Sequence, residues 1–477
     1  MDLVVFGTGN FFSKKKKYLL NNNIVAYIDN NVNLIGKDID GILIHKVEDV
    51  KNMIYDYIVL MSLNTKEMKN QLLDYGVESD KILLFEDYCA ICLKEKKYIA
   101  SECYDVMYAK KINVLLVVPV VDESGVPIAN IRLADVLVHN GYNITIFAPY
   151  GETRLIDEIV KKGINVYLIP SLLSYKHFDN DICEYEYDFI IVNSPGNWPF
   201  VAKYSWKYKI NWWFHDPQNV HENEIDKIED CFKNILEENK HLPQIFCDEN
   251  INLFAVSEVA RNIYVNTFGK LLCKEVEVLP YALSECEEID SVERTEKLVF
   301  AVIGYATYIK GQDIFVKAIK KMRYSDRAEF WIIGNFDEST HFCKEILNDI
   351  NELKNVKIKG VVPYDQMQKL YSEISVVVSS SRQDMLPTVL AEGMQHKKIC
   401  ITSDSTGMTS YIDDMKNGFV FESGNEKDLA DKMDYIICNY DDLDYIANNG
   451  YLTYREFFSE EILYDRVLRM INSDKYR

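Results

Sequence analysis

Residues 375–394 read SVVVSSSRQDMLPTVLAEGM, and this stretch predicts a strand, a polar loop and a helix in that order. The three β-branched valines at 376–378 favour a buried strand over residues 375–378. Pro387 suits the first turn of a helix, where its missing N–H group is not needed. In open α/β sheets, ligands bind at the carboxyl ends of strands, where such loops lie. The stretch therefore predicts a parallel α/β domain with a ligand site in this loop.

The same alternation of β-rich and amphipathic helical runs extends along the whole chain, which favours an α/β fold throughout. Its 477 residues suit roughly three domains. We expect a small domain at 1–100, a polar linker at 93–111, a second domain at 111–283, an acidic connection at 284–296 and a third domain at 297–477. The last helices of the third domain can cross back to the second. The expected strands are residues 2–6, 24–28, 41–44, 57–61, 81–85, 112–118, 143–147, 165–169, 189–192, 210–214, 253–256, 275–279, 298–303, 330–333, 356–359, 375–378 and 399–402.

The composition is that of a folded, acidic protein. The formal net charge of -21 makes nucleic acid, with its phosphate backbone, an unfavourable partner. No secretory signal opens the sequence, and the longest apolar run, 112–121, is about half as long as a membrane helix requires. We therefore expect a cytoplasmic protein, with peripheral contact at the inner face of a membrane as an open option.

The 11 cysteines are scattered, and most lie in apolar segments. Without an export signal they are expected to be reduced, buried thiols. Cys89 and Cys92 form one Cys-x-x-Cys pair, but a zinc site needs four ligands and no second pair lies nearby. We therefore expect these two to be core cysteines and expect no bound metal.

Two acidic residues in the 375–394 stretch point to a nucleotide sugar. Asp384 lies in the loop, and Glu392 lies two turns into the following helix. Leu386, Thr388 and Val389 complete the candidate donor site, because backbone N–H groups at a helix start can bind a phosphate. A nucleoside diphosphate sugar needs one carboxylate for its hydroxyls, amides for its phosphates and a second carboxylate for its ribose. The alternative is structural, with Asp384 as a helix cap and Glu392 as a solvated side chain.

This pattern resembles the retaining family 4 glycosyltransferases, whose signature is two glutamates separated by seven residues. The present chain has Asp384-MLPTVLA-Glu392, then Thr406-Gly407, then NGFVF at 417–421. The resemblance covers about residues 112–473. It implies a GT-B fold, in which two Rossmann-like domains face a cleft, here preceded by a small additional Rossmann-like domain.

The resemblance implies further site residues in both large domains. Gly304 and Lys310 follow the first expected strand of the third domain, and Lys310 is expected to neutralise the departing diphosphate. Tyr305 stands where the family usually has an Arg that shares this task. His215 ends a strand of the second domain and is expected to touch the donor sugar. A surface lysine and an ordinary loop histidine are the structural alternatives.

The loop after the first strand of the second domain reads Asp122-Glu123-Ser124-Gly125. It resembles the glycine-rich loop of the family, with one glycine left of the usual pair. Gly125 would let the backbone approach an anion closely. We therefore include Gly125 among the candidate donor-binding residues.

The N-terminal domain carries most of a dinucleotide fingerprint. Gly7 and Gly9 follow a strand, and Asp29 ends the next one. Phe12 replaces the third glycine, and its bulk would push the helix away from the strand. The domain resembles small Rossmann-like modules of bacterial sugar-modifying enzymes. The alternatives for Gly7, Gly9 and Asp29 are therefore a nucleotide site and a structural or docking role. The alternatives for the lysines at 14–17 are contact with phosphates and a solvated run.

The expected function is metal-independent transfer of a sugar, with retained anomeric configuration, from a nucleotide-diphosphate sugar to a glycan, lipid-linked or protein acceptor. No tightly bound cofactor is expected, and a protein partner or an oligomer can form through the N-terminal domain. The main alternative is a non-catalytic GT-B subunit that binds a partner transferase or an acceptor. A nicotinamide enzyme ranks last, because the N-terminal unit has no catalytic domain of its own.

Overall fold

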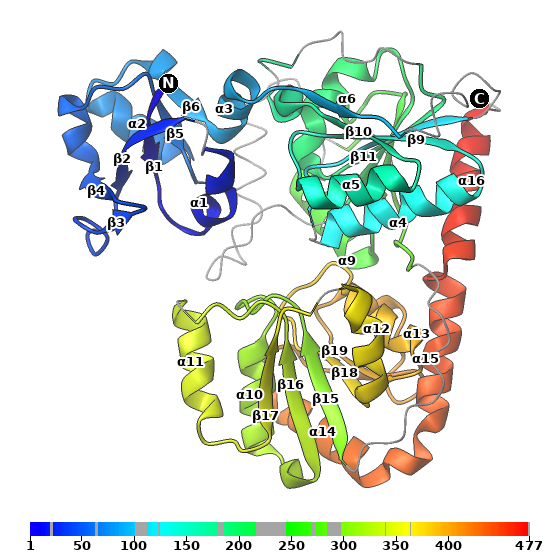
Figure 1. Ribbon diagram of the computed structural model, residues 1–477. Helices are drawn as coiled ribbons and strands as arrows, with labels where there is room; N and C mark the ends of the chain where they lie inside the picture. Colours follow the sequence, from blue (N-terminus) through cyan, green and yellow to red (C-terminus); the bar gives the residue numbers. More distant parts are fainter. Residues whose placement is uncertain are drawn as a thin grey trace.

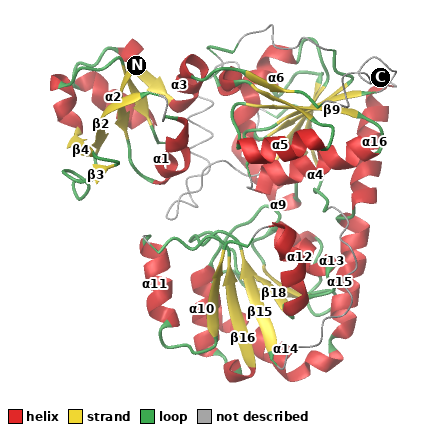
Figure 2. Cartoon of the chain, viewed as in Figure 1, coloured by secondary structure: helices red, strands yellow, loops and turns green. Residues whose placement is uncertain are grey.

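The computed structural model folds into three sheet-based domains that follow one another along the chain (Figure 1). It describes all residues except 20–21, 63–64, 101–111, 123–124, 175, 179–185, 216–244, 270–271, 284–296, 339, 363 and 476–477. Among the described strands, every pairing is parallel except β3 with β4 and β7 with β10. Helices lie against the sheets, as Figure 2 shows. The α/β fold with parallel sheets that the sequence predicts is therefore confirmed.

The N-terminal domain has a six-stranded sheet in the order β3-β4-β2-β1-β5-β6. Its central strands are buried because their residues are almost all apolar, as in β1, where Leu3, Val4 and Val5 are fully buried. The strands are β1 Asp2–Phe6, β2 Asn23–Asp29, β3 Asp38–Ile39, β4 Ile42–Lys46, β5 Tyr57–Leu60 and β6 Ile82–Leu84. The helices are α1 Asn10–Lys15, α2 Thr65–Asp74 and α3 Phe85–Cys92.

The second domain has an eight-stranded sheet in the order β14-β13-β12-β11-β8-β9-β10-β7. The strands are β7 Lys96–Tyr98, β8 Asn113–Val117, β9 Asn143–Ala148, β10 Asn165–Leu168, β11 Phe189–Asn193, β12 Ile210–Phe214, β13 Ile251–Ala255 and β14 Val276–Val278. The described helices are α4 Gly125–His139, α5 Thr153–Lys161, α6 Trp198–Tyr204 and α9 Glu258–Phe268. A single-turn 3-10 helix at Pro170–Leu173 follows β10.

Strand β7 differs from the sequence-based expectation, which placed residues 93–111 in a linker and ended the first domain at residue 100. β7 runs antiparallel to β10 at the edge of the second sheet, with Tyr98 opposite Val166. Ala100 is fully buried, and its backbone N–H donates to Asn165 Oδ1 at 3.0 Å. An edge strand needs few apolar residues, which explains why the polar Lys-Lys-Tyr of β7 looked like a linker.

The third domain has a six-stranded, fully parallel sheet in the order β17-β16-β15-β18-β19-β20. The strands are β15 Leu298–Ile303, β16 Ala328–Ile333, β17 Val356–Gly360, β18 Val376–Ser379, β19 Ile399–Ser403 and β20 Phe419–Phe421. The helices are α10 Gln312–Lys321, α11 His341–Ile350, α12 Tyr364–Glu373, α13 Thr388–Gln395, α14 Glu426–Asn439, α15 Asp444–Phe457 and α16 Glu460–Lys475.

The last helix connects the third domain to the second. α16 runs upward from α15 along the second domain in Figure 1 and packs against α4. Leu463 and Val467 of α16 are buried in the same apolar core as the second sheet. The backbone N–H of Leu283 also donates to the Phe458 carbonyl at 2.8 Å. The two large domains are therefore joined by packing as well as by chain connectivity.

The N-terminal domain packs against the loops that follow β8, β9 and β10. Phe85 and Tyr88 of α3 share a buried apolar cluster with Val120 and Tyr150 of the second domain. Polar contacts surround this cluster. They join Lys15 Nζ to Tyr150 Oη at 2.9 Å, Lys17 Nζ to Glu152 Oε1 at 2.8 Å and Ser174 Oγ to Asp87 Oδ1 at 2.6 Å.

The structure corrects one expectation about the cysteines. Cys247 and Cys273 form a disulfide, with their Cα atoms 5.0 Å apart, whereas all the cysteines were expected to be reduced. Residues so far apart in sequence give no local sign of pairing, because only the fold brings them together. Cys89 is a buried thiol and Cys92 a half-buried one, both in α3. Of the helices that the structure describes, none is long and apolar enough to cross a membrane.

Candidate functional site

Lys310 and Asp384 form the central contact of the candidate site. Asp384 lies between β18 and α13, and Lys310 lies between β15 and α10. Lys310 Nζ donates to Asp384 Oδ2 at 2.5 Å, and the Asp384 side chain is only 8% exposed. β15 and β18 are neighbours in the sheet, so the loops after them lie side by side. The structure thus brings together two of the three residues expected to take part in the reaction.

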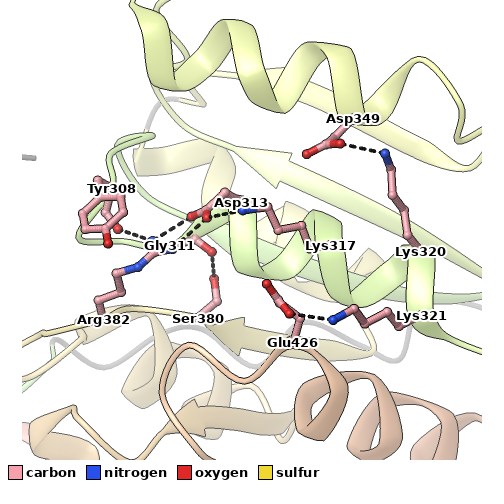
Figure 3. Close-up of polar contacts among 10 residues, drawn as sticks. All are labelled: Tyr308, Gly311, Asp313, Lys317, Lys320, Lys321, Asp349, Ser380, Arg382 and Glu426. Atoms are coloured by element: carbon pink, nitrogen blue, oxygen red, sulfur yellow. Dashed lines mark hydrogen bonds and ion pairs between the residues drawn. The ribbon is translucent and has the colours of Figure 1, made fainter.

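Two glycines shape the loop that carries Lys310. Gly304 has φ +141 and Gly311 has φ +68, conformations that L side chains rarely adopt. A Cβ atom at Gly311 would lie 2.0 Å from the Ser380 carbonyl oxygen, so no side chain fits there. Ser380 Oγ in turn donates to the Gly311 carbonyl at 2.7 Å (Figure 3). The loops after β15 and β18 are therefore closely packed and hydrogen-bonded to each other beside the Lys310–Asp384 pair.

An arginine that sequence reasoning missed reinforces this junction. Both terminal nitrogens of Arg382 donate to the carboxylate of Asp313, each at 2.7 Å (Figure 3). Arg382 also lies over the Tyr308 ring at 3.8 Å and donates to the Tyr308 carbonyl at 2.6 Å. Burial raises the pKa of Asp313, but the hydrogen bonds and charges of Arg382 and Lys317 outweigh it and lower that pKa below its usual value. Arg382 therefore serves to hold the loop.

Helix α13 presents its first turn next to Asp384. It begins at Thr388 after Pro387, whose φ is -65, and no side chain caps its first N–H groups within the described part of the chain. Asp384 pairs with Lys310 instead of acting as the helix cap, which was the structural alternative. Leu386 is 5% exposed and anchors the loop in the core, while Thr388 and Val389 are half-buried. Open N–H groups at a helix start are suited to an anion.

Glu392 lies on α13 between the two large domains. Arg132 of α4 donates from Nη2 to Glu392 Oε1 at 3.0 Å, and Tyr371 of α12 donates from Oη to Oε2 at 2.8 Å. The side chains of Arg132 and Glu392 are 7% and 16% exposed. The alternative of a solvated Glu392 is therefore wrong. Its predicted contact with a ribose stays a prediction, and each carboxylate oxygen already has one protein donor.

The loop after β19 contacts the backbone of Asp384. Asp384 and Thr406 form an isolated β-bridge, and Gly407 N donates to the Asp384 carbonyl at 2.9 Å. A Cβ atom at Gly407 would lie 1.8 Å from the Met385 carbonyl oxygen and 2.6 Å from Ser257 Oγ. Only glycine fits at position 407, which gives a physical reason for the Thr-Gly pair that the sequence analysis singled out.

His215 directly follows β12 in the second domain and is 3% exposed. Its Nε2 lies 2.8 Å from Asn193 Oδ1, and the Asn193 amide nitrogen donates to the Val117 carbonyl at 3.2 Å. With the amide in this orientation, His215 Nε2 carries the proton and Nδ1 is an acceptor. Burial lowers the pKa of His215 to about 3, so the ring is neutral at ordinary pH. Asn193 was not found from the sequence.

Gly125 is the first residue of α4, in the loop-to-helix junction that follows β8 of the second domain. A Cβ atom there would meet nothing within 4 Å, so packing does not require glycine at this position. The neighbouring Glu123 and Ser124 lie outside the described residues. The anion-binding role of Gly125 stays a prediction.

In the N-terminal domain, the loop that carries Gly7 and Gly9 is hydrogen-bonded to Asp29, the acidic residue of the fingerprint. Thr8 donates to Asp29 Oδ2 from its backbone N–H at 2.8 Å and from its hydroxyl at 2.7 Å, and Asn31 N donates to Oδ1 at 2.9 Å. Gly7 has φ +96, and a Cβ atom there would lie 3.0 Å from the Met61 carbonyl. Phe12 is 3% exposed, in α1, which spans six residues. A structural reason thus exists for Gly7 and Asp29, while Gly9 has open space around it.

The sequence-predicted residues thus fall into separate groups. Gly304, Lys310, Asp384, Leu386, Thr388, Val389 and Glu392 belong to adjoining loops and one helix of the third domain. His215 and Gly125 belong to the second domain, and the Gly7 loop belongs to the first. Sequence reasoning missed Arg132, although an arginine within the mostly apolar helix α4 is a signal that could have found it. Among the described residues, no group of three or more His, Cys, Asp or Glu is placed to hold a metal ion.

Comparisons with known protein families identify two segments. Residues 286–453 match the model of glycosyl transferases group 1. Residues 1–83 match the model described as C2185-like, N-terminal. The first match covers most of the third domain, including the Lys310 and Asp384 loops, and the second covers most of the N-terminal domain.

Two curated relatives match part of the chain. A poly(ribitol-phosphate) alpha-N-acetylglucosaminyltransferase of Staphylococcus aureus is 26% identical over 182 residues, which are 38% of this chain and 36% of that protein. An uncharacterized glycosyltransferase of Methanocaldococcus jannaschii is 28% identical over 143 residues, 30% of this chain and 38% of that protein. The chain thus matches little more than a third of the length of either relative.

Solved structures match a larger share of the chain. A glycosyltransferase from Rickettsia africae superposes with a TM-score of 0.61 at 20% identity, covering 76% of this chain and 98% of that one. HepE of Anabaena in complex with UDP-glucose has a TM-score of 0.61 at 15% identity, covering 76% of this chain and 100% of that one. At such identities the likeness concerns the fold. The chain therefore contains a glycosyl transferases group 1 domain, at residues 286–453, within the GT-B fold of glycosyltransferases.

Proposed function

We propose that this protein is a retaining, metal-independent glycosyltransferase. It moves a sugar from a nucleotide-diphosphate sugar to a glycan, lipid-linked or protein acceptor. The donor binds the third domain, and the acceptor enters over the second. The observation that carries the proposal is the contact of Lys310 with Asp384 at the C-terminal edge of the third sheet, where α/β sheets bind their ligands.

Each group has a task that follows from its charge and position. Lys310 and the first turn of α13 stabilise negative charge on the departing diphosphate. Asp384 accepts hydrogen bonds from the donor sugar, and Glu392 from the ribose hydroxyls. In the structure the charges of Lys310 and Asp384 neutralise each other. A bound donor has a phosphate for the lysine and hydroxyls for the carboxylate, so both partners keep hydrogen bonds when it enters.

Catalysis then depends mainly on orientation and charge stabilisation. The acceptor hydroxyl attacks the anomeric carbon on the face from which the diphosphate departs. The leaving phosphate oxygen takes the proton of that hydroxyl, so the new bond has the configuration of the old one. His215, neutral and fixed by Asn193, offers an acceptor nitrogen for a sugar hydroxyl on the second-domain side. No tightly bound cofactor takes part in this scheme.

The test has two stages. Thermal shift with a panel of nucleotide sugars selects the donor, because a ligand that binds only the native state raises the unfolding temperature. Hydrolysis of that donor by the full-length protein is then measured, and the anomeric configuration of the first sugar product is read by proton NMR. An inverted product would remove the retaining mechanism. A protein that binds no nucleotide sugar would not be the proposed enzyme.

The alternative of a non-catalytic GT-B subunit has one observation in its favour. Tyr305, which replaces the usual arginine, is 43% exposed, so the loop offers one cation fewer than the family pattern. A subunit of this kind would bind donor without hydrolysing it, whereas the proposed enzyme hydrolyses donor slowly in the absence of acceptor. Donor hydrolysis therefore separates the two functions.

A further inference from the structure

Glu392, the second acid of the stretch from Asp384 to Glu392, is hydrogen-bonded to the second domain. Arg132 of α4 reaches Glu392 of α13 across the boundary between the second and third domains, with 3.0 Å between Nη2 and Oε1. Both side chains are largely buried, so the pair is weakly screened by solvent. Tyr371, fully buried on α12, donates to the other oxygen at 2.8 Å. Two neighbours from different domains therefore fix the orientation of this carboxylate.

The other end of the motif also contacts the second domain. Ser257, at the start of α9, donates from Oγ to the Met385 carbonyl, one residue after Asp384, at 2.5 Å. Gly407 leaves just enough room for this contact, since its missing side chain would overlap both groups. The stretch from Asp384 to Glu392 is thus held by the second domain at both ends.

The bound carboxylate still has acceptor capacity. An ionised carboxylate has roughly four lone-pair sites, and Arg132 and Tyr371 use two of them. Ribose hydroxyls can take the remaining ones without displacing either protein donor. A guanidinium is planar and rigid, so it fixes the angle of a carboxylate better than a lysine ammonium does.

We propose that Arg132 is a positioning residue for donor binding, which holds Glu392 in the orientation that accepts the ribose hydroxyls and thereby couples nucleotide binding to the contact between the two large domains. This inference rests on the proposed function, because it requires a nucleoside diphosphate in the third domain. Arg132 itself does not touch the reacting atoms. Its effect is on the ribose contact, which can be measured apart from stability.

The experiment compares ribose with deoxyribose. Binding of UDP, GDP and ADP to the full-length protein is measured by calorimetry, and the one that binds most tightly is compared with its 2′-deoxy form. We expect the wild type to prefer the ribonucleotide by about tenfold, the effect of one charge-assisted hydrogen bond. In Arg132→Met the ratio should fall to about one to twofold, and Arg132→Lys should lie between the two.

The matched control is Arg154→Met. Arg154 is an exposed arginine of the same domain that pairs with Glu158 at 3.0 Å, and its loss should leave the ratio unchanged. If Arg132→Met does not fold, the same ratio in Arg132→Lys decides the matter. An unreduced ratio in a folded Arg132 variant overturns the inference and leaves the proposed function standing. Failure of the wild type to bind any nucleotide sugar of the panel, as well as these three diphosphates, contradicts the proposed function itself, and the inference with it.

Discussion

Lys310 and Asp384 lie 74 positions apart in sequence, yet their side chains meet at 2.5 Å above the third sheet. Their contact follows from topology. β15 and β18 pair in parallel, so the chain must leave both strands at the same edge of the sheet. Lys310 on one loop then faces Asp384 on the next. An ion pair at this edge can exchange its partners for the phosphate and hydroxyls of a donor, which makes Asp384 the first residue to test.

Asp384→Asn should lower turnover more than it lowers nucleotide affinity, because Asp384 is expected to contact the sugar and not the nucleoside. Losing a charge-assisted hydrogen bond costs roughly 1.5–3 kcal/mol, which is about ten- to a hundredfold in rate. Asp384→Glu should keep most activity, since it restores the acid of the family signature. Donor hydrolysis and nucleotide calorimetry are the two measurements. Asp349→Asn, in an exposed ion pair with Lys320, is the control.

Full activity in Asp384→Asn would contradict the assignment of this residue. Equal losses of turnover and nucleotide affinity would move Asp384 from the sugar to the nucleotide.

Glu392→Ala should weaken nucleoside diphosphate binding and affect the later steps less. The expected loss is about 1.5–3 kcal/mol of binding free energy, because a carboxylate that receives hydroxyl donors is removed. The same change leaves Arg132 without this partner at the domain boundary, so a lower melting temperature is also expected. Calorimetry gives the affinity and differential scanning fluorimetry the stability. Glu345→Ala, exposed on α11, should change neither, and an unchanged affinity in Glu392→Ala would be incompatible with a ribose contact.

A chelator should leave transfer activity intact. Lys310 and the start of α13 are expected to carry the charge neutralisation that divalent ions supply in other enzymes. The measurement is donor turnover before and after treatment with EDTA, followed by readdition of magnesium or manganese. Loss of activity in the chelator and its recovery with either metal would show that a divalent ion neutralises the diphosphate, in contradiction to this prediction.

Stability should fall on acidification because His215 is buried in its neutral form. Its pKa is about 6.5 when unfolded and about 3 when folded, so the unfolded chain binds the extra proton between these values. The free energy of unfolding should therefore drop as pH falls from about 6.5 towards 3, by up to about 1.4 kcal/mol per pH unit from this group. His396, stacked on Tyr371 and with its pKa lowered to about 4 chiefly by burial, acts in the same direction.

Urea unfolding between pH 7 and 5 tests this linkage. His215→Gln keeps a polar group beside Asn193 and removes the titration, so its stability should depend less steeply on pH than that of the wild type. Parallel curves for the two proteins would mean that His215 is not buried neutral. His341→Gln is the control, because His341 is an exposed histidine on α11.

Local patterns predicted what is local in the structure. The strand, loop and helix at 375–394 depend on neighbouring residues, and β18 and α13 lie where the β-branched run and Pro387 indicated. Contacts such as Arg132 with Glu392, which are 260 positions apart, depend on how two domains meet, and no spacing rule encodes that. The same holds for the Cys247–Cys273 disulfide and for the pairing of β7. Polar partners such as Asn193 become visible only when adjacent strands are placed side by side.

Removing the N-terminal domain tests the division of labour between the domains, and the structure fixes where to cut. A protein that begins near Lys110 loses β7 and the hydrogen bond from Ala100 to Asn165, whose side chain is 2% exposed. A protein that begins at Lys94 keeps both. The shorter protein should therefore be less stable than the longer one by about 1–3 kcal/mol, the cost of a lost buried hydrogen bond. Urea unfolding of the two proteins measures the difference.

The protein beginning at Lys94 should keep donor hydrolysis, because every residue proposed for the donor lies in the two large domains. It should lose solubility, since the cut uncovers Val120 and Tyr150, which the N-terminal domain buries. Transfer to acceptor should fall more than hydrolysis, because the removed domain packs on the second domain, over which the acceptor is expected to enter. Donor hydrolysis and transfer are measured side by side with the full-length protein. A truncated protein that is folded by circular dichroism but hydrolyses no donor would place the N-terminal domain within the donor site, and it would reverse this division of labour.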